Sequence, residues 1–381
     1  MNQDKIYDIA IIGGGLAGLQ LAFGILQEND LADKSILILE KENKTANDKS
    51  WSFWEKGQGR WDEIVHKSWS KADFTGRQFS RRYELTPYAY KMIRSEDFYA
   101  FVKEKIVKSP NVQWQKDQVQ EVIFGDPHQC IGEKSSYSAT TVFDSRLTDD
   151  FENSDYPFVL QHFKGWFIET DHAVFDDSTF QMMDFENEHK ANCAFTYVLP
   201  FSPQKALVEF TFFSPQLVDD KVYETEIKEY IHKKLNIQQY QITETEKGVI
   251  PMSAYPFQEG NQNNYLKIGT GGGWVKSSSG YSFKNTSNKI KQVISNLKEG
   301  KALDYNLFQK RFQFYDRIYL SVLQSENQLG AQLFEEMYHR NDIQNIFKFL
   351  DEQSQLSDEI KLISKFSKAP FLKALRREYL R

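Results

Sequence analysis

The chain has 381 residues, of which 40% are hydrophobic, 15% are aromatic and 26% are charged. This length predicts two or three structural units, and the aromatic content suits a large core or a pocket for a large apolar ligand. The net charge of −6 argues against nucleic acid as a partner, and the two cysteines and scattered histidines offer neither a disulfide framework nor metal-ligand spacing, so no metal is expected.

A glycine-rich turn follows the first apolar run. The run Ile9–Ile12 predicts a strand, and the apolar stretch Leu19–Leu26 predicts a helix. Between them, Gly13, Gly15 and Gly18 form the pattern G-x-G-x-x-G. The first glycine allows a sharp turn, the second lets the backbone approach a pyrophosphate, and the third lets the helix pack on the strand. The N–H groups at the start of the helix would then face the phosphates.

A second strand, Ile36–Leu39, ends in Glu40, about 20 residues after the last glycine, as a dinucleotide site requires. A carboxylate there can accept hydrogen bonds from an adenosine ribose. Strand, turn, helix and acid together predict dinucleotide binding; the alternative is a glycine-rich turn in an ordinary α/β protein.

The turn begins so close to Met1 that we expect no secretory signal before it, and no run reaches the roughly 18–20 apolar residues of a membrane span. We therefore expect a cytoplasmic protein.

The middle of the chain changes from a mixed to a β-rich pattern. Ser95 is expected to cap a helix that ends near Lys108, and strands are expected at 119–124 and 140–143. From Gly165 to Phe213, β-rich runs follow one another without helical spacers, which predicts an inserted antiparallel sheet. A helix near 224–234 and a return strand at 265–269 follow, and the pattern beyond Ser287 is helical.

A second glycine cluster follows the return strand. It contains Gly269, Gly271 and Gly272 and leads into another helical segment. In two-domain flavoproteins such a segment closes over the ribityl-pyrophosphate and the isoalloxazine, so the sheet insertion with this late return favours FAD over NAD. The alternative is a plain glycine-rich loop.

These features predict an α/β fold. It combines a Rossmann-like FAD-binding domain with an inserted antiparallel-sheet substrate domain and a helical C-terminal region. The predicted boundaries are 1–164 for the first part of the FAD-binding domain, 165–249 for the substrate-binding sheet, 250–295 for the return segment and 296–381 for the helical region.

The last residues carry an unusual charge. Between Lys361 and Arg381, seven basic residues and one acid give +6, which leaves −12 for the rest of the chain. Apolar residues alternate with these charges, a pattern that an anionic membrane surface attracts. The sequence therefore predicts peripheral membrane contact; the alternative is a solvated terminal helix packed on its own domain.

Several segments share a pattern with one known family, and they extend along nearly the whole chain. They are 8–18, 49–54, 142–146, 160–166, 182–185, 196–201, 207–211, 248–252 and 269–283. In their order and spacing the chain resembles lycopene beta-cyclases of carotenoid synthesis. Ser277–Ser279 depart from the family pattern, in which a proline and a threonine are usual, and Phe210 stands where a second acid is often found.

The resemblance implies proton-initiated cyclisation of the acyclic ends of lycopene to β-ionone rings, giving β-carotene via γ-carotene. An acid protonates the terminal double bond, the neighbouring alkene closes the ring, and loss of a ring proton completes the isomerisation. FAD is implied in its reduced form, maintained by NAD(P)H, with no net electron transfer to the carotenoid. The substrate is then lycopene or another carotenoid with acyclic ends.

Glu209 matches the family's catalytic glutamate. It lies in an apolar, aromatic strand, where desolvation would raise the pKa of its carboxyl and favour a form that can donate a proton. The alternative is an outward-facing glutamate on a half-solvated strand. Trp51, Phe53 and Trp54 could cover the flavin or stabilise a cation, or simply pack in the core.

Two other functions remain open. A flavin-dependent monooxygenase or a polyprenyl reductase would change the mass of an apolar substrate, whereas a cyclase would not. A non-catalytic flavin-containing carotenoid binder would hold its pigment unchanged.

Overall fold

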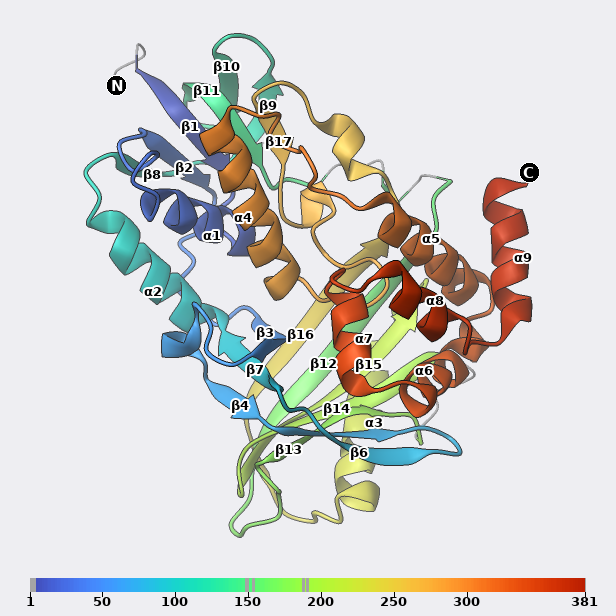
Figure 1. Ribbon diagram of the computed structural model, residues 1–381. Coiled ribbons are helices and arrows are strands. Elements are labelled where there is room, and N and C mark those ends of the chain that lie inside the picture. The colour runs from blue at the N-terminus through green and yellow to red at the C-terminus, as the bar shows by residue number, and fades with distance from the viewer. Residues whose placement is uncertain (1–4, 148–150, 153–154, 187–188, 190–191, 381) are drawn as a thin grey trace.

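The glycine-rich turn follows the first strand of a mixed sheet, whose strands lie in the upper part of Figure 1. The computed structural model describes residues 5–147, 151–152, 155–186, 189 and 192–380. Among these, the strands of this first sheet are β1 (Ile6–Ile12), β2 (Ile36–Glu40), β8 (Val112–Lys116), β9 (Val119–Ile123), β10 (His128–Gly132), β11 (Ser136–Asp144) and β17 (Tyr265–Lys267).

The centre of the first sheet is parallel. The strand order is β8-β2-β1-β11-β10-β9, and β17 pairs in parallel with the carboxyl end of β11, while β9 and β10 are antiparallel. Apolar side chains of β1 and β2 pack under three helices. The predicted Rossmann-like unit and its return strand are confirmed. The helices are α1 (Leu16–Leu26), α2 (Ser95–Val107) and α4 (Phe283–Glu299).

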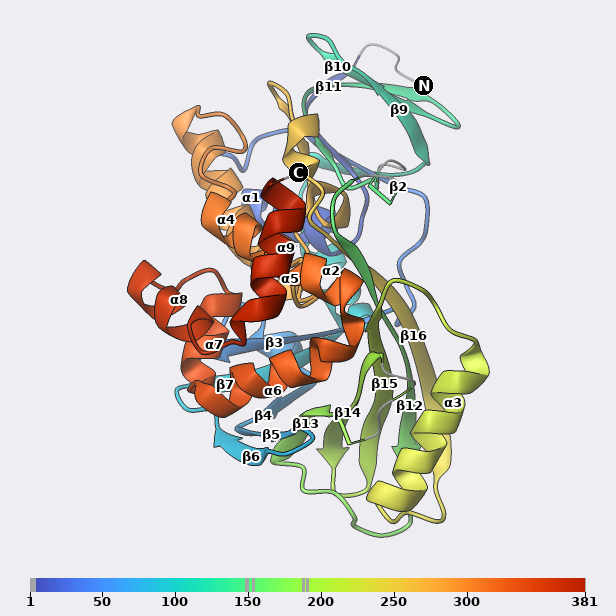
Figure 2. The same cartoon turned by 90° about the vertical axis from the view of Figure 1, so that its right-hand side faces the viewer.

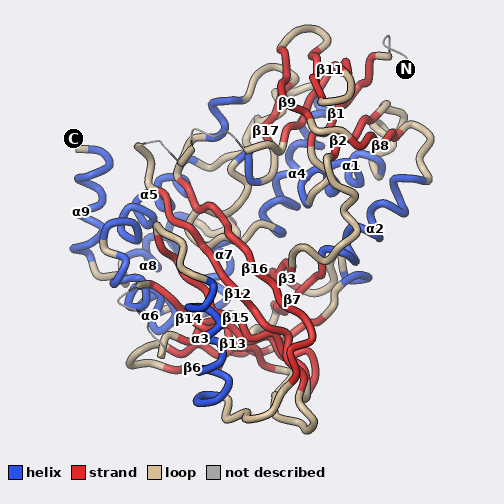
Figure 3. The backbone as a smooth tube through the Cα atoms, turned by 180° about the vertical axis from the view of Figure 1, so that it is seen from behind, coloured by secondary structure: helices blue, strands red, loops and turns tan. Residues whose placement is uncertain are grey.

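A second, strongly curved sheet occupies the lower half of the molecule, and its long strands are seen from behind in Figure 3. Its order is β16-β12-β15-β14-β13-β5-β6, and every pair except β13 with β5 is antiparallel. The strands are β5 (Lys71–Thr75), β6 (Ser80–Glu84), β12 (Phe158–Glu169), β13 (Thr179–Asp184), β14 (Cys193–Ser202), β15 (Lys205–Ser214) and β16 (Gln241–Ser253).

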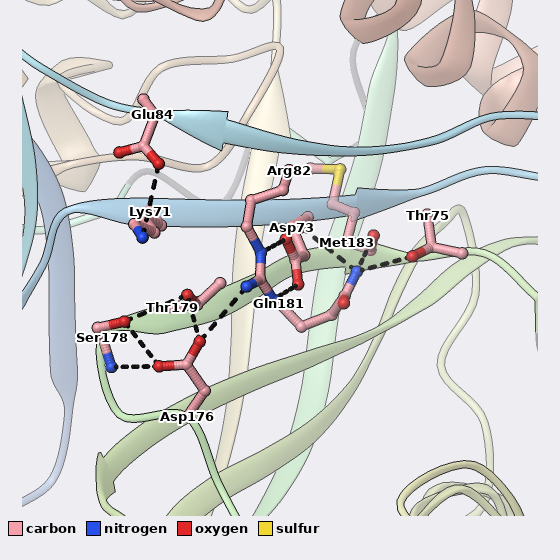
Figure 4. A network of polar contacts seen from close by, with 10 residues as sticks. All are labelled: Lys71, Asp73, Thr75, Arg82, Glu84, Asp176, Ser178, Thr179, Gln181 and Met183. Carbon is pink, nitrogen blue, oxygen red and sulfur yellow. Dashed lines mark hydrogen bonds and ion pairs between the residues drawn. The ribbon is translucent and has the colours of Figure 1, made fainter.

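Polar contacts fasten β5 and β6 to this sheet (Figure 4). The guanidinium of Arg82 donates two hydrogen bonds of 2.8 Å to Asp73 and lies 3.5 Å from Asp176. The hydroxyls of Ser178 and Thr179 donate hydrogen bonds to the same Asp176. These hydrogen bonds, and the positive charge of Arg82, lower the pKa of the Asp176 carboxyl to about 2. A hairpin from the first quarter of the chain is thereby held on strands from its middle.

Helices cover both faces of the second sheet, and a small third sheet completes the fold. Figure 2 shows α3 on one face and the C-terminal helices on the other. The strands β3 (Ser50–Lys56), β7 (Tyr88–Arg94) and β4 (Lys67–Trp69) form a small third sheet. The helices are α3 (Asp220–Glu229, continued by a π-helical turn at Tyr230–Lys234), α5 (Lys310–Ser325), α6 (Gly330–Arg340), α7 (Ile343–Leu350), α8 (Leu356–Ile363) and α9 (Lys368–Tyr379), with short 3₁₀ turns at Asp62–Ile64, Phe257–Gly260, Thr270–Gly272 and Asn327–Leu329.

Two details differ from expectation. The second sheet extends outside 165–249, since β12 begins at Phe158, β16 ends at Ser253, and the β5–β6 hairpin comes from the first part of the chain. Ser95 does not cap α2: it is the first helical residue, and its hydroxyl accepts a hydrogen bond from the N–H of Lys49 at 3.0 Å. In the described part of the chain, the helices are too short or too polar to cross a membrane.

Candidate functional site: a dinucleotide cavity beside a buried acid

Two of the three glycines of the first turn meet a steric requirement of the fold, and the third faces open space. Gly13 has a φ of +104°, and a Cβ on it would lie 1.9 Å from Oγ of Ser145. A Cβ on Gly18 would lie 2.0 Å from the carbonyl oxygen of Gly13, so only glycine lets α1 pack this closely on the turn. Gly15, in contrast, has no atom within 4 Å of an added Cβ and faces open space.

Glu40 is buried at the end of β2 and touches the turn. Its Oε2 accepts a hydrogen bond of 2.6 Å from the N–H of Gly14, and its Oε1 accepts one of 2.9 Å from Glu42. These bonds hold the carboxylate beside the glycines, where a ribose hydroxyl could add a further bond. Glu40 is therefore held against the turn, but it is not among the described residues that line the cavity beside it, and its contact with a ribose stays a prediction.

The return loop approaches the same turn. Gly269 has a φ of +60°, and its added Cβ would lie 3.2 Å from Cβ of Ala17 in α1. Gly271 and Gly272 instead pack against the backbone. An added Cβ would lie 2.2 Å from the carbonyl oxygen of Arg146 at Gly271, and 2.3 Å from the carbonyl oxygen of Lys267 at Gly272. The structure thus brings the two glycine clusters together. Gly269 contacts α1, while Gly271 and Gly272 let the return loop pack closely against the backbone of Arg146 and Lys267.

A cavity of about 370 Å³ lies between the turn and the return loop. Gly15, Gly18 and Gly269 line it, as do Lys44 and Lys49. The N-terminus of α1 opens onto it with no side-chain cap and no acid in the first turn, so its N–H groups are available to an anion. The cavity therefore has the N–H donors that a pyrophosphate needs, although Lys44 is already paired with Glu42 at 2.8 Å and Asp48 lies in the same wall. The residues present fit a dinucleotide.

Glu209 lies in an adjoining cavity of about 130 Å³, which shares the wall residues Ser50, Trp51 and Phe163 with the first. Its side chain is buried, and the hydroxyl of Thr211 donates a hydrogen bond of 2.7 Å to Oε1. Burial, and then the negative charge of Glu246, raise the pKa of Glu209 well above its ordinary value. The expected pocket-facing acid is present in the structure, and the outward-facing alternative is wrong.

Glu246, on β16, is a site residue that the sequence analysis missed. It lines both cavities and hydrogen-bonds to the carboxyl of Glu209. The hydroxyl of Ser50 donates to its Oε2 at 3.0 Å. The alternating pattern of residues before Gly248 indicates a strand that contains Glu246. That pattern does not show which neighbouring strand Glu246 pairs with, so its place beside Glu209 could not be predicted.

Three other positions in the segments that resemble the family lie away from the cavity of Glu209: Phe210, Asp144 and Asp184. Phe210 is fully buried on the opposite face of β15 against α3, so a second acid at that position would not reach the cavity. Asp144 pairs with Arg146 at 2.7 Å, and Asp184 accepts a hydrogen bond of 2.9 Å from Tyr230. Neither of these two aspartates lines the cavity of Glu209 among its described wall residues.

The aromatic residues near position 51 separate into two groups. Trp51 lines both cavities, whereas Phe53 stacks on Phe283 with ring centroids 4.7 Å apart. Trp54 stacks on Phe347 at 4.5 Å. Phe53 and Trp54 thus pack in the core, and of these three aromatic residues only Trp51 faces the site.

Three tyrosine hydroxyls form a chain beside Glu209. Tyr197 donates to the hydroxyl of Tyr90 at 2.8 Å, and the hydroxyls of Tyr90 and Tyr281 lie 3.2 Å apart. All three side chains line the cavity of Glu209. The chain provides the cavity with electron-rich rings, which can stabilise a nearby cation.

The loop that carries Tyr281 is held in place despite its three serines. The N–H of Gly280 donates to the carbonyl of Lys276 at 2.8 Å, and the N–H of Lys276 donates to that of Tyr281 at 2.9 Å. The buried ammonium of Lys276 pairs with Asp316 at 2.8 Å and with Glu352 at 2.9 Å. A closed turn and a cluster of ion pairs thus hold the loop that carries the three serines.

A third cavity, of about 330 Å³, extends from Tyr281 to the C-terminal helices. Its wall is almost entirely apolar, and Met183, Ser279 and Tyr281 belong to both this cavity and that of Glu209. At the far end it is lined by Leu372 of α9, which is 57% exposed, so the cavity reaches the surface there.

Comparisons place this architecture among known proteins. A search of curated protein sequences finds no match. A geranylgeranyl bacteriochlorophyll reductase-like protein from Thermoplasma acidophilum has a similar fold, with 12% identity over 99% of this chain and 97% of that chain and a TM-score of 0.58. The flavin-dependent brominase Bmp2 matches with 13% identity over 98% of each chain and a TM-score of 0.60.

A flavoprotein/dehydrogenase from Cytophaga hutchinsonii matches with 12% identity over 94% of this chain and 99% of that chain, with a TM-score of 0.62. These likenesses establish the fold alone. The family model described as "Lycopene cyclase protein" matches residues 8–376, nearly the whole chain, and the chain therefore belongs to the lycopene cyclase family.

Proposed function

We propose that the protein cyclises the acyclic ends of lycopene to β-ionone rings with FAD as its cofactor. The observation that carries this proposal is a buried acid, Glu209, at the junction of a dinucleotide cavity and an apolar cavity that reaches the surface. The family match supports carotenoid cyclisation in general. Lycopene, the β-ring product and the direction of proton transfer are the finer parts of the proposal.

The chain's own residues would act in sequence. The apolar cavity binds one end of the polyene and excludes water, and Glu209 in its acid form donates a proton to the terminal double bond. The neighbouring alkene closes the ring, and a ring proton is lost, so the product keeps the mass of the substrate. Tyr197 and Tyr281 present their rings to the cavity in which the cation would form. When bound, reduced FAD, kept reduced by NAD(P)H, would supply a fixed negative charge beside that cation without net electron transfer.

The experiment is expression of Glu209→Gln in lycopene-accumulating cells, followed by pigment chromatography and mass measurement. The amide preserves the shape of the side chain but cannot act as an acid, and loss of such a group costs about 10²–10⁴-fold in rate. We expect β-carotene from the wild-type protein and lycopene from the variant, with equal FAD content. A wild-type product heavier by oxygen or hydrogen would instead indicate a monooxygenase or a reductase.

We also propose that α8 and α9 dock on an anionic membrane surface and admit the carotenoid. Ile363, Leu372 and Leu380 are 36%, 57% and 73% exposed in the segment of excess positive charge. Basic residues among exposed apolar side chains suit shallow insertion beside anionic headgroups. The cavity that ends at Leu372 would then open toward the bilayer.

Sedimentation with anionic vesicles tests this docking. Lys361→Glu should weaken binding at low salt, whereas Lys108→Glu makes the same charge change just after the end of α2 and should not. Higher salt should weaken wild-type binding, because the screening length falls to about 3 Å at 1 M. Salt-independent binding would exclude the electrostatic part of the proposal, and equal effects of the two variants would exclude docking through α8.

A further inference from the structure

Glu209 and Glu246 face each other across a single glycine. Glu209 of β15 pairs with Gly165 of β12, and Glu246 of β16 pairs with the same Gly165 from the other side. Residues that pair directly on neighbouring antiparallel strands lie on the same face of the sheet. The two glutamates therefore rise from one face on either side of a residue without a side chain.

Gly165 provides the space in which the two side chains meet. A Cβ on it would lie 3.3 Å from Cγ of Glu246 and 3.4 Å from Cβ of Glu209. It would also lie 2.7 Å from Cδ1 of Leu207. The two glutamates thus close over the glycine, and their carboxyl groups hydrogen-bond to each other.

In the described part of the chain, neither Glu209 nor Glu246 forms an ion pair. The charge of Arg94 acts to lower the pKa of Glu246, but its guanidinium pairs with Glu244 at 2.8 Å and with Glu96 at 3.0 Å. The titratable or charged side chains around the pair are Tyr197 of β14, Tyr90 and Arg94 of β7, Tyr281 of the return loop, Glu244 of β16 and, in the wall of the cavity beside the glycine-rich turn, Lys44, Asp48, Lys49, Tyr99 and Lys247.

Two carboxylates this close and this buried cannot both be ionised without a counter-ion, so one proton is retained between them. The donors around the pair determine which oxygens stay free. Thr211 donates to Oε1 of Glu209 and Ser50 donates to Oε2 of Glu246, which leaves one oxygen of each group for the bond between them. Burial raises the pKa of Glu246 as well as that of Glu209.

We infer that Glu246 is the proton partner of Glu209: the two side chains share one proton across Gly165, and Glu246 keeps that proton on Glu209 at neutral pH. Glu246 is a positioning residue, because it acts through Glu209. As a statement about cyclisation, the inference rests on the proposed function. One proton then passes from the pair to the substrate, the ring later releases one proton, and the pair regains a single proton.

The test compares pH profiles of cyclisation by the holoenzyme with lycopene in detergent micelles. Glu246→Gln removes the negative charge beside Glu209, so the alkaline limb should move to lower pH by about 1–3 units. Glu244→Gln is the matched control. It makes the same change two residues away on the same strand, where the carboxylate accepts from Arg94 at 2.8 Å and from Asn47 at 2.9 Å. Its alkaline limb should move much less.

Infrared titration of the protonated-carboxyl C=O band gives a readout that does not need activity. Coupling is reciprocal, so Glu209→Gln should lower the pKa of Glu246 as Glu246→Gln lowers that of Glu209. This second variant also decides the inference if Glu246→Gln does not fold. An unmoved alkaline limb, equal shifts in Glu246→Gln and Glu244→Gln, or a carboxyl band that titrates identically in wild type and variants would overturn the inference. If the wild-type protein forms no cyclised isomer, the proposed function fails, and the infrared titration alone decides whether the proton is shared.

Discussion

Substitution of Gly15 separates cofactor binding from folding. Its φ of −85° and ψ of −161° are ordinary extended values, and an added Cβ meets no atom within 4 Å. Valine can therefore replace Gly15 without strain, and the free energy of unfolding of the apoprotein should change by no more than about 0.5 kcal/mol. The valine side chain would enter the cavity at the N-terminus of α1, where the pyrophosphate is expected to bind.

The expected loss of FAD affinity follows from the N–H groups that open there. A hydrogen bond to a charged group contributes about 1.5–3 kcal/mol, so losing two of them costs about 3–6 kcal/mol. This corresponds to an increase of about 10²–10⁴-fold in Kd. At an FAD concentration of 100 times the wild-type Kd, the ligand stabilises the wild type by about 2.7 kcal/mol, and this stabilisation should be nearly absent in Gly15→Val.

The assay is isothermal titration of apoprotein with FAD, together with urea unfolding in its presence and absence. Gly260→Val is a matched control, because an added Cβ there lies 3.9 Å from its nearest neighbour, in Lys267, and Gly260 does not line the dinucleotide cavity. A folded Gly15→Val protein that binds FAD with the wild-type Kd would refute the assignment of the phosphate site.

Three further substitutions test the packing and charges around the site. Phe210→Ala should lower the free energy of unfolding in urea by about 3–5 kcal/mol while leaving the alkaline limb of cyclisation in place; a moved limb would show that position 210 affects the acid pair. Lys276→Met leaves Asp316 and Glu352 buried without their cation and should cost about 3–5 kcal/mol at pH 7, less in acid as they protonate; a neutral effect would contradict the buried ion pairs. Burial lowers the pKa of His162 to about 4, below its ordinary 6.5, so its contribution to stability is complete above pH 6.5 and is lost as the pH falls toward 4. His162→Gln should therefore show a smaller difference between urea midpoints at pH 7 and pH 4.5 than the wild type, and an equal difference would exclude this role.

The glycine-rich half of the candidate site could be predicted from the sequence because its signals are local. Gly13, Gly15 and Gly18 lie within one turn, and the strand before them and the helix after them have distinct apolar patterns. The return strand at 265–269 was also expected, and β17 does pair with β11. Each of these features depends on residues that are neighbours in the chain.

The acid pair could not be predicted, because it depends on the register of three strands. Strand alternation predicts which residues share a face of β16, but not which residue of another strand each one faces. Glu209 and Glu246 come together only because both pair with Gly165, and the glycine is informative only once that register is known. The place of β5 beside β13 was missed for the same reason, since no local pattern encodes a parallel contact between distant segments.

The discontinuous sheets have a consequence for synthesis of the protein. The first sheet gains its last strand, β17, only after the ribosome has produced every strand of the second sheet, and β5 must wait for β13. Until then β5 and β11 have strand edges without their final partners, and such edges invite aggregation. Contacts between distant segments also slow folding. A fragment cut at 165 and 249 would break β12 and β16 and lack the β5–β6 hairpin, so the substrate sheet should not fold in isolation.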